Sequence, residues 1–384
     1  MAIHWYQQLW PVIIPSVKSS LGLSDIQLGT LSSLRQFTTG PMMLPSGLVA
    51  DFFRSKTAII LAIAFAFLGL SHFLVSTAQS FSWIIPCIML MGVGHALWHP
   101  AAMGSLSLRF PDKRGSALAT HGVGASIGDT IGPVAIGAVL LVLTWQSMLK
   151  LHLVPALIIS FLLWKTLSAS YAADQGTRPS IKSFLVDAKS MLQHRVVLVI
   201  VGVTTLTQMA RLSIITFLPV YIQNDLQYSA LGLGFFWGLL HIMGAVSQPV
   251  MGYLSDKFGR KPILLPSLAL FSLLYFALSV ASPGFQLILV IGSLGLFFYA
   301  LGNITTAAMM DVAKDSVQSS TMGITSVITQ TLSLPSPIIA GALVTHYGTS
   351  SAFIYAGSVT LLAALLLAVV SLPKPTHATP RFAG

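Results

Sequence analysis

Long apolar runs separated by short polar stretches recur along the whole 384-residue sequence. A helix needs about 20 consecutive apolar residues to cross the hydrocarbon core of a bilayer. The pattern predicts twelve transmembrane helices. We place them near residues 3–18, 27–50, 57–77, 81–108, 115–143 and 149–171, and then near 196–221, 229–254, 262–282, 285–310, 320–345 and 350–372.

One long polar stretch, residues 172–195, divides these runs into two groups of six. The second group repeats the first at an offset of about 204 residues, which aligns Pro15 with Pro219. Duplicated membrane halves are typical of transporters whose substrate site lies near the midplane between the halves. The predicted organisation is an N-terminal six-helix half at 1–171, a linker at 172–195, a C-terminal six-helix half at 196–372 and a tail at 373–384.

The composition is that of a membrane protein. Charged residues make up 8% of the sequence, against roughly 25% in soluble domains, and hydrophobic residues reach 54%. The net charge of +10 does not indicate a nucleic-acid partner, because the Lys and Arg residues gather in alternate loops and in the tail. This is the bias of cytoplasmic loops. We therefore expect a multi-pass protein of the bacterial inner membrane, surrounded by lipid, with its linker and C-terminus in the cytoplasm.

The loop between the eighth and ninth spans carries a recognisable motif. It contains Gly252, Asp256, Gly259, Arg260 and Lys261 in the spacing G-x-x-x-D-x-x-G-R-K. This segment resembles the loop signature of the major facilitator superfamily. The resemblance implies an all-α transporter of twelve helices in two pseudo-repeats around a central cavity, with the motif acting in gating.

The loop between the second and third spans holds a degenerate copy of this motif. It keeps Gly47, Asp51 and Lys56, but has Arg54 where the second Gly belongs and Ser55 in place of an Arg. We therefore expect Asp51 to contribute less to gating than Asp256.

A second motif lies in the fifth span and consists of Gly124, Gly128, Asp129, Gly132 and Pro133. With the preceding His99-Pro100 and Arg114-Gly115 pairs, it resembles the fosmidomycin-resistance subgroup and the fifth-helix motif of drug–proton antiporters. The match departs at Ala119, where a Gly is expected, and at Ile88, where such exporters carry an Arg. The glycines recur once per turn, which allows close helix packing.

Ionisable residues inside the membrane are costly and are usually functional. At about 1.5 Å per residue, five of them lie roughly 21–24 Å from the cytoplasmic ends of their helices. They are Arg35, His95, Asp129, Arg211 and His241. We expect them to lie at one level around a central cavity.

Asp129 is the candidate for proton coupling, together with Arg35. A conformational change that makes and breaks this pair would load and release a proton. The alternative is a fixed ion pair that joins the second and fifth spans. Arg35 and Arg211 could also bind a carboxylate or phosphate, since guanidinium groups contact both in a bidentate way. The alternative is that each pairs with an acid or a backbone carbonyl.

The remaining candidates for substrate binding are aromatic: His95, His99, His241, Trp98 and Trp237. The histidines could line the cavity, relay protons or form hydrogen bonds between helices, and the tryptophans could equally pack against lipid or core. His95 and His99 have the helical spacing of metal ligands. No Cys or Glu cluster accompanies them, so we expect no metal and no cofactor.

These features predict a proton-coupled transporter that exports a small organic compound, with anions among the candidates, by alternating access. Uptake of a small organic anion by proton symport is one alternative. A non-transporting membrane receptor or scaffold is another, although the linker and tail are short for signalling. An enzyme is not expected, because the polar segments hold no nucleophile–base pair, metal cluster or phosphate loop. We expect a monomer.

We also expect the first helix to lack its beginning. Aligned on Pro15 and Pro219, the start of the seventh span near Val196 corresponds to a point about eight residues before Met1. The apolar run in the first span is also shorter than the roughly 20 residues that a span needs. The alternative is a short first helix that thins the bilayer locally.

Overall fold

The computed structural model describes residues 1–167, 194–312, 318–370 and 372. Nearly all of the predicted linker, and the whole of the predicted tail, lie outside the described residues.

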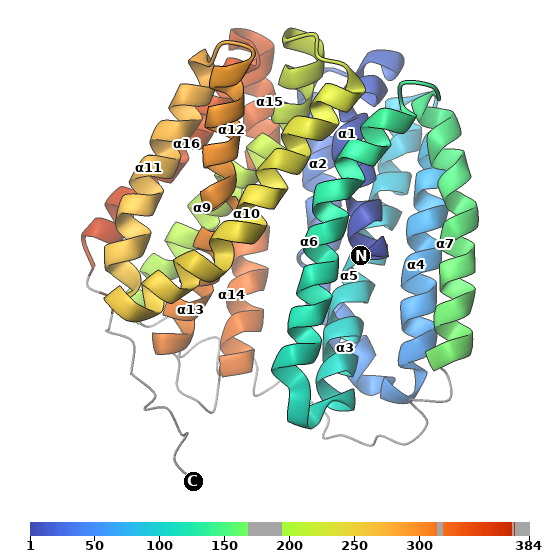
Figure 1. Cartoon of the computed structure of the whole chain (residues 1–384), viewed down its shortest axis with the longest axis horizontal. Coiled ribbons are helices and arrows are strands. Elements are labelled where there is room, and N and C mark those ends of the chain that lie inside the picture. Colours follow the sequence, from blue (N-terminus) through green and yellow to red (C-terminus); the bar gives the residue numbers. More distant parts are fainter. Residues whose placement is uncertain (168–193, 313–317, 371, 373–384) are drawn as a thin grey trace.

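The first half contains six membrane-spanning segments and is coloured blue to green in Figure 1. In chain order they are α1 (Ala2–Leu21), α2 with α3 (Asp25–Thr39 and Met43–Phe52), α4 (Thr57–Ser76), α5 (Phe81–Arg109), α6 (Arg114–Val139) and α7 (Trp145–Leu167). α4 packs between α5 and α7, and α1 packs against α6. All α1 residues from Leu9 to Pro15 are buried, so α1 is an interior helix of the bundle.

The second half also contains six segments and is coloured yellow-green to red in Figure 1. They are α9 (Arg195–Val220) continued by the π-helical turn η4 (Tyr221–Asp225), α10 (Ala230–Phe258), α11 (Arg260–Val280), α12 with α13 (Phe285–Phe298 and Ala300–Val312), α14 with α15 (Gln318–Leu332 and Ser336–Tyr347) and α16 (Ser350–Ala368). Of the described segments, ten are long and apolar enough to cross a membrane, and α1 and the α2–α3 pair complete twelve. The predicted fold is confirmed.

Three spans that we predicted as continuous are each divided into two helices. The second and eleventh spans break beside Pro41 and Pro335, where the missing N–H group removes a helical hydrogen bond. The tenth span breaks at Tyr299, which no proline marks. Irregular backbone at membrane depth is tolerated where it is buried in protein or lines a cavity. Tyr299 fits this rule, because its side chain lines the cavity described below.

The two halves meet along two helix pairs, α6 with α10 and α2 with α15. In each pair a glycine lies directly against the backbone of the partner helix. A Cβ on Gly137 would overlap the carbonyl of Ala230, and a Cβ on Gly341 would overlap the carbonyl of Asp25. Gly137 and Gly341 are related by the repeat offset of 204 residues, so the two contacts are equivalent. Both lie at the end of the molecule opposite the Asp256 loop.

Candidate functional site

A cavity of about 360 Å³ lies between the halves. The first half contributes residues of α1, α2 and α6, and the second half contributes residues of α9, α10, α12 and α14, together with Tyr299. The lining residues with a polar side-chain group are His4, Gln7, Gln8, Trp10, Ser32, Arg35, Gln36, Thr39, Asp129, Gln208, Arg211, Thr216, Trp237, His241, Tyr299 and Gln330. Four of the five predicted ionisable residues thus face one cavity, and His95 is the exception.

Asp129 is held by two residues of α1. Its Oδ2 atom lies 3.1 Å from Nδ1 of His4, and its Oδ1 atom accepts a hydrogen bond of 2.7 Å from Nε2 of Gln8. The predicted pairing of Asp129 with Arg35 is therefore not the arrangement seen here. The physical reason is that α1 packs against α6 and brings its own polar side chains to the carboxylate.

The glycines of α6 explain how α1 comes so close. A Cβ on Gly124 or Gly128 would meet the backbone of Met1, and a Cβ on Gly132 would contact the side chain of Gln8. This stripe of small residues therefore gives α1 room to place His4 and Gln8 against Asp129.

A chain of hydrogen bonds continues from Asp129 into the second half. Gln8 Nε2 lies 3.2 Å from Nε2 of His241, and the indole Nε1 of Trp237 donates to Gln8 Oε1 at 2.7 Å. An indole N–H can only donate, so it fixes which end of the Gln8 amide is oxygen. The amide nitrogen must then point toward Asp129 and His241.

This orientation also assigns the state of His241. Its Nε2 faces a donor and must accept, while its Nδ1 lies 2.7 Å from the carbonyl oxygen of Trp237 and donates to it. His241 is therefore a neutral imidazole with its hydrogen on Nδ1. Gln8 and His241 form a polar link across the two halves.

Two guanidinium groups face the cavity without a carboxylate partner. Among the described residues, no ion pair joins Arg35 or Arg211 to an acid, and the Nε atom of each is buried with no hydrogen-bond partner. The Arg211 guanidinium carbon lies 5.0 Å from the ring centre of Phe298 and 4.7 Å from that of Tyr299. Buried charges normally pair, so this arrangement suits an anion in the cavity.

Three predicted binding residues lie away from the cavity lining. His95 is 1% exposed, and its two ring nitrogens have no partner among the described residues. The Trp98 ring packs edge-on against Phe65, with 5.6 Å between ring centres. His99 reaches the site indirectly, because its Nε2 lies 3.2 Å from Nε2 of Gln7. The structure therefore does not bring these three together with Arg211.

No metal centre is apparent in the part of the chain that the structure describes. It contains no group of three or more His, Cys, Asp or Glu side chains placed to hold a metal ion.

The loop motif ties four helices together at one end of the molecule. Arg260, the first residue of α11, contacts Asp256 one turn earlier and donates from Nε to Oδ2 of Asp311 in α13 at 2.7 Å. Lys261 donates to the carbonyl oxygens of Ala368 and Val370 at 2.8 and 2.6 Å.

The two glycines of the motif behave differently. Gly259 has a φ of +101°, a conformation that favours glycine, whereas a Cβ on Gly252 would meet open space. The side chain of Asp51, in the degenerate copy, lies outside the described part of the structure.

Comparison with known proteins decides the family. The model described as Major Facilitator Superfamily matches residues 5–334 and, in a second match, residues 241–384. The chain belongs to the major facilitator superfamily. The solved structure of the nucleoside transporter NupG superimposes with a TM-score of 0.81 over 95% of each chain. At 14% sequence identity this likeness concerns the fold alone.

Curated sequence relatives include proteins named as transporters. Solute carrier family 22 member 18 of Rattus norvegicus is 28% identical, covering 94% of this chain and 89% of its own length. A probable L-galactonate transporter of Escherichia coli is 23% identical, covering 91% and 82%. The multi-drug resistance efflux pump PmrA of Streptococcus pneumoniae is 27% identical over a shorter stretch, 40% of this chain and 39% of its own.

Sequence reasoning missed the amides of this candidate site, namely Gln7, Gln8, Gln36, Gln208 and Gln330. Each lies within a predicted apolar span. A neutral amide inside a span is itself a signal, because it needs a hydrogen-bond partner in the bilayer.

Proposed function

We propose that this superfamily transporter exports a small organic anion in exchange for protons, by alternating access through the central cavity. The observation that carries the proposal is the pair Arg35 and Arg211, two guanidinium groups that face the cavity without an acid partner among the described residues. A carboxylate or phosphate would supply the missing partner. The relative named as a probable L-galactonate transporter gives further support for an anion.

The proton would be carried by the His4–Asp129 pair. The 3.1 Å contact between Nδ1 and Oδ2 can hold one proton between an imidazole nitrogen and a carboxylate oxygen. Asp129 also bonds to Gln8, which reaches His241 in the other half. A change in protonation at Asp129 would therefore alter the hydrogen bonds of Gln8, including its contact with His241 between the halves. In this proposal His4 takes the place of Arg35 as the coupling partner, and Arg35 binds substrate.

Export is supported by two likenesses. The α6 stretch from Gly124 to Pro133 resembles the fosmidomycin-resistance subgroup and the drug–proton antiporters, and a multidrug efflux pump matches part of the chain. We further propose that residues 1–171 and 196–372 are the two moving units, and that the linker, the tail and the Asp256 loop lie in the cytoplasm of a bacterial cell. The distribution of Lys and Arg supports this orientation.

The test uses purified protein in liposomes that contain a pH-sensitive dye, with a panel of organic acids and their uncharged amide analogues. We expect one or more acids, but not their amides, to drive proton movement. Arg211→Gln should abolish the response, because a neutral amide cannot neutralise the anion. Proton movement driven equally by amides, or retained in full by Arg211→Gln, would contradict the proposal. Accumulation in everted rather than right-side-out membrane vesicles would establish export over uptake.

A further inference from the structure

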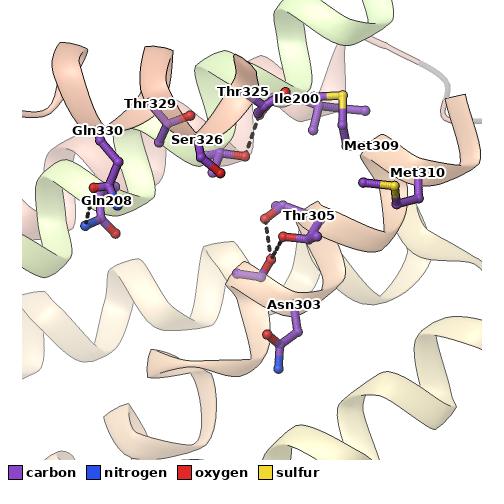
Figure 2. A pocket seen from close by; sticks show the side chains of 13 residues that line it. Ile200, Gln208, Asn303, Thr305, Met309, Met310, Thr325, Ser326, Thr329 and Gln330 are labelled. Atoms are coloured by element: carbon purple, nitrogen blue, oxygen red, sulfur yellow. Dashed lines mark hydrogen bonds between the residues drawn. The ribbon is translucent and has the colours of Figure 1, made fainter. Parts of the chain in front are cut away.

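A second cavity, of about 240 Å³, lies within the C-terminal half between α9, α13 and α14. It adjoins the central cavity, because Gln208 and Gln330 line both. The two amides are in contact, with Gln208 Nε2 3.5 Å from Gln330 Oε1, and Gln36 of the other half also donates to Gln330 Oε1. Figure 2 shows this pair at one end of the second cavity.

The chemistry of the second cavity differs from that of the first. None of its thirteen lining residues is ionisable, and nine of them carry a hydroxyl or a side-chain amide. In Figure 2, Thr325, Ser326 and Thr329 of α14 line one side, and Asn303 and Thr305 line the other. The central cavity, by contrast, contains Arg35 and Arg211.

Two hydroxyls in this cavity lack partners. Thr325 and Thr329 lie one turn apart on α14, and their Oγ1 atoms are buried without a hydrogen bond to any described residue. The whole of Thr329 is 5% exposed. A buried hydroxyl without a partner costs free energy, so these two positions are suited to a ligand that supplies hydrogen bonds.

Other side chains of the cavity offer acceptors. The hydroxyls of Thr305 and Thr306 both donate to the carbonyl oxygen of Gly302, and that of Thr204 donates to Ile200. Their hydrogens are thus used, while their oxygen lone pairs can still accept. The side chains of this cavity therefore offer both hydrogen-bond donors and acceptors. A hydroxyl group on a ligand both donates and accepts, so it could bond to either kind.

We propose that the α9–α13–α14 cavity is a second subsite that binds the uncharged, hydroxyl-bearing part of the transported anion. The anionic group would lie at Arg35 and Arg211 in the central cavity, and the hydroxylated chain would extend past Gln330. This inference rests on the proposed function and adds the class of substrate: a polyhydroxylated organic anion rather than a plain or aromatic acid.

The experiment measures binding of three probes to the purified full chain by calorimetry. Gluconate carries both a carboxylate and several hydroxyls, hexanoate has the same carbon chain without hydroxyls, and sorbitol has hydroxyls without a carboxylate. We expect gluconate to bind at least tenfold more tightly than either of the others, since each added hydrogen bond of typical strength contributes up to about tenfold. Equal affinity for gluconate and hexanoate, or no binding of gluconate, would overturn the inference.

Variants separate the two parts of the argument. Thr329→Val keeps the shape and removes the hydroxyl, and should weaken gluconate binding about tenfold while leaving hexanoate unchanged. Ser326→Ala should act in the same direction. The matched control is Thr360→Val, because Thr360 is also buried but its hydroxyl donates to the carbonyl oxygen of Ala356, and Thr360 lines neither cavity. Unchanged gluconate binding in both subsite variants would refute the subsite.

Failure of the proposed function gives a different result. If Arg211→Gln leaves gluconate and hexanoate binding intact, the anion site is wrong. If Arg211→Gln abolishes both while the α14 variants bind like wild type, the anion site stands and the subsite is wrong. Thermal unfolding of each variant, compared with wild type, confirms that the differences arise from binding and not from misfolding.

Discussion

Gln8 of the first half and His241 of the second are joined by a contact of 3.2 Å between their Nε2 atoms. Trp237 sets its direction, since its indole N–H can only donate and must face the Gln8 carbonyl oxygen. The contact therefore requires an unprotonated Nε2 on His241. Because Gln8 also donates to Asp129, one side chain connects the candidate proton site to the opposite half.

We expect Gln8→Leu to remove the hydrogen-bond link between Asp129 and the second half. Leu fills a similar volume but can neither donate to Asp129 nor accept from Trp237. Hydrogen bonds to charged groups contribute about 1.5–3 kcal/mol, so transport coupled to a pH gradient should fall by roughly tenfold or more. Dye-reported proton movement in liposomes measures this. The control is Gln286→Leu, which should transport normally, because the Gln286 side chain accepts from Ser282 N–H in a loop and lines neither cavity.

Asp129→Asn should separate substrate binding from proton coupling. Asn keeps an oxygen that accepts from Gln8, so the geometry of the site survives, but it cannot take up or release a proton. We expect exchange of labelled substrate across the membrane to continue, while accumulation driven by a pH gradient is lost. Both are measured in the same liposomes.

Asp25→Asn is the matched control for Asp129→Asn. Asp25, the first residue of α2, also pairs with a basic residue of α1, Lys18, at 2.5 Å. This pair lies at the C-terminal end of α1, and neither residue lines the cavity. It should retain gradient-driven accumulation. Accumulation at the wild-type level in Asp129→Asn would remove this residue from the coupling mechanism.

The fold was accessible from sequence because the bilayer forces each span to be apolar and long, so that twelve runs predict twelve helices. The breaks were less accessible. Pro41 and Pro335 are sequence signals for a break, whereas nothing in the sequence around Tyr299 marks the end of α12. Local pattern does not report where a cavity interrupts a helix.

The site shows a second limit of the same kind. Counting residues from the helix ends gives depth but not direction, so it placed His95 at the level of Asp129 without revealing that His95 is buried outside the cavity lining. Which side chain reaches Asp129 depends on the close packing of α1 against α6. That packing selected His4 rather than Arg35, and no spacing within one helix encodes it.

The two acidic partners of Arg260 should differ in their effect on the transport rate. Arg260 contacts both Asp256 and Asp311, but the Asp256 side chain is 68% exposed and that of Asp311 is 17% exposed. Exposed ion pairs contribute about 0–1 kcal/mol, whereas removing one partner of a buried pair costs more, because the other charge is left buried and unpaired. We therefore expect Asp256→Asn to slow transport up to about fivefold and Asp311→Asn to slow it further. Transport rates of wild type, Asp256→Asn and Asp311→Asn, compared at equal membrane expression, test this order.

Asp51→Asn serves as the comparison for these loop variants, since its copy of the motif is degenerate. It should reduce transport less than Asp256→Asn. Wild-type rates in both Asp256→Asn and Asp311→Asn would show that the contacts of Arg260 do not limit the conformational cycle.

The contact between α6 and α10 includes a second glycine. Gly234 lies so close to the carbonyl of Pro133 that a Cβ there would overlap it. The overlapping atoms belong to the backbone, so no side chain can move aside to make room. Gly234→Ala should therefore disfavour the arrangement described here and populate one in which the halves separate at this end. Helix propensity works in the opposite direction, because Ala is favoured over Gly by about 1 kcal/mol, so a loss of helix would not explain the effect.

Spin labels at two exposed positions near this contact, Val142 and Gln227, would report the separation in a Cys87→Ser background. We expect longer distances in Gly234→Ala than in wild type. Gly104→Ala is the matched control, because a Cβ at Gly104 meets open space and should leave the distances unchanged. Distances that stay at the wild-type value in Gly234→Ala would mean that the halves can yield at Pro133 without separating, and the close glycine contact would then not hold this end closed.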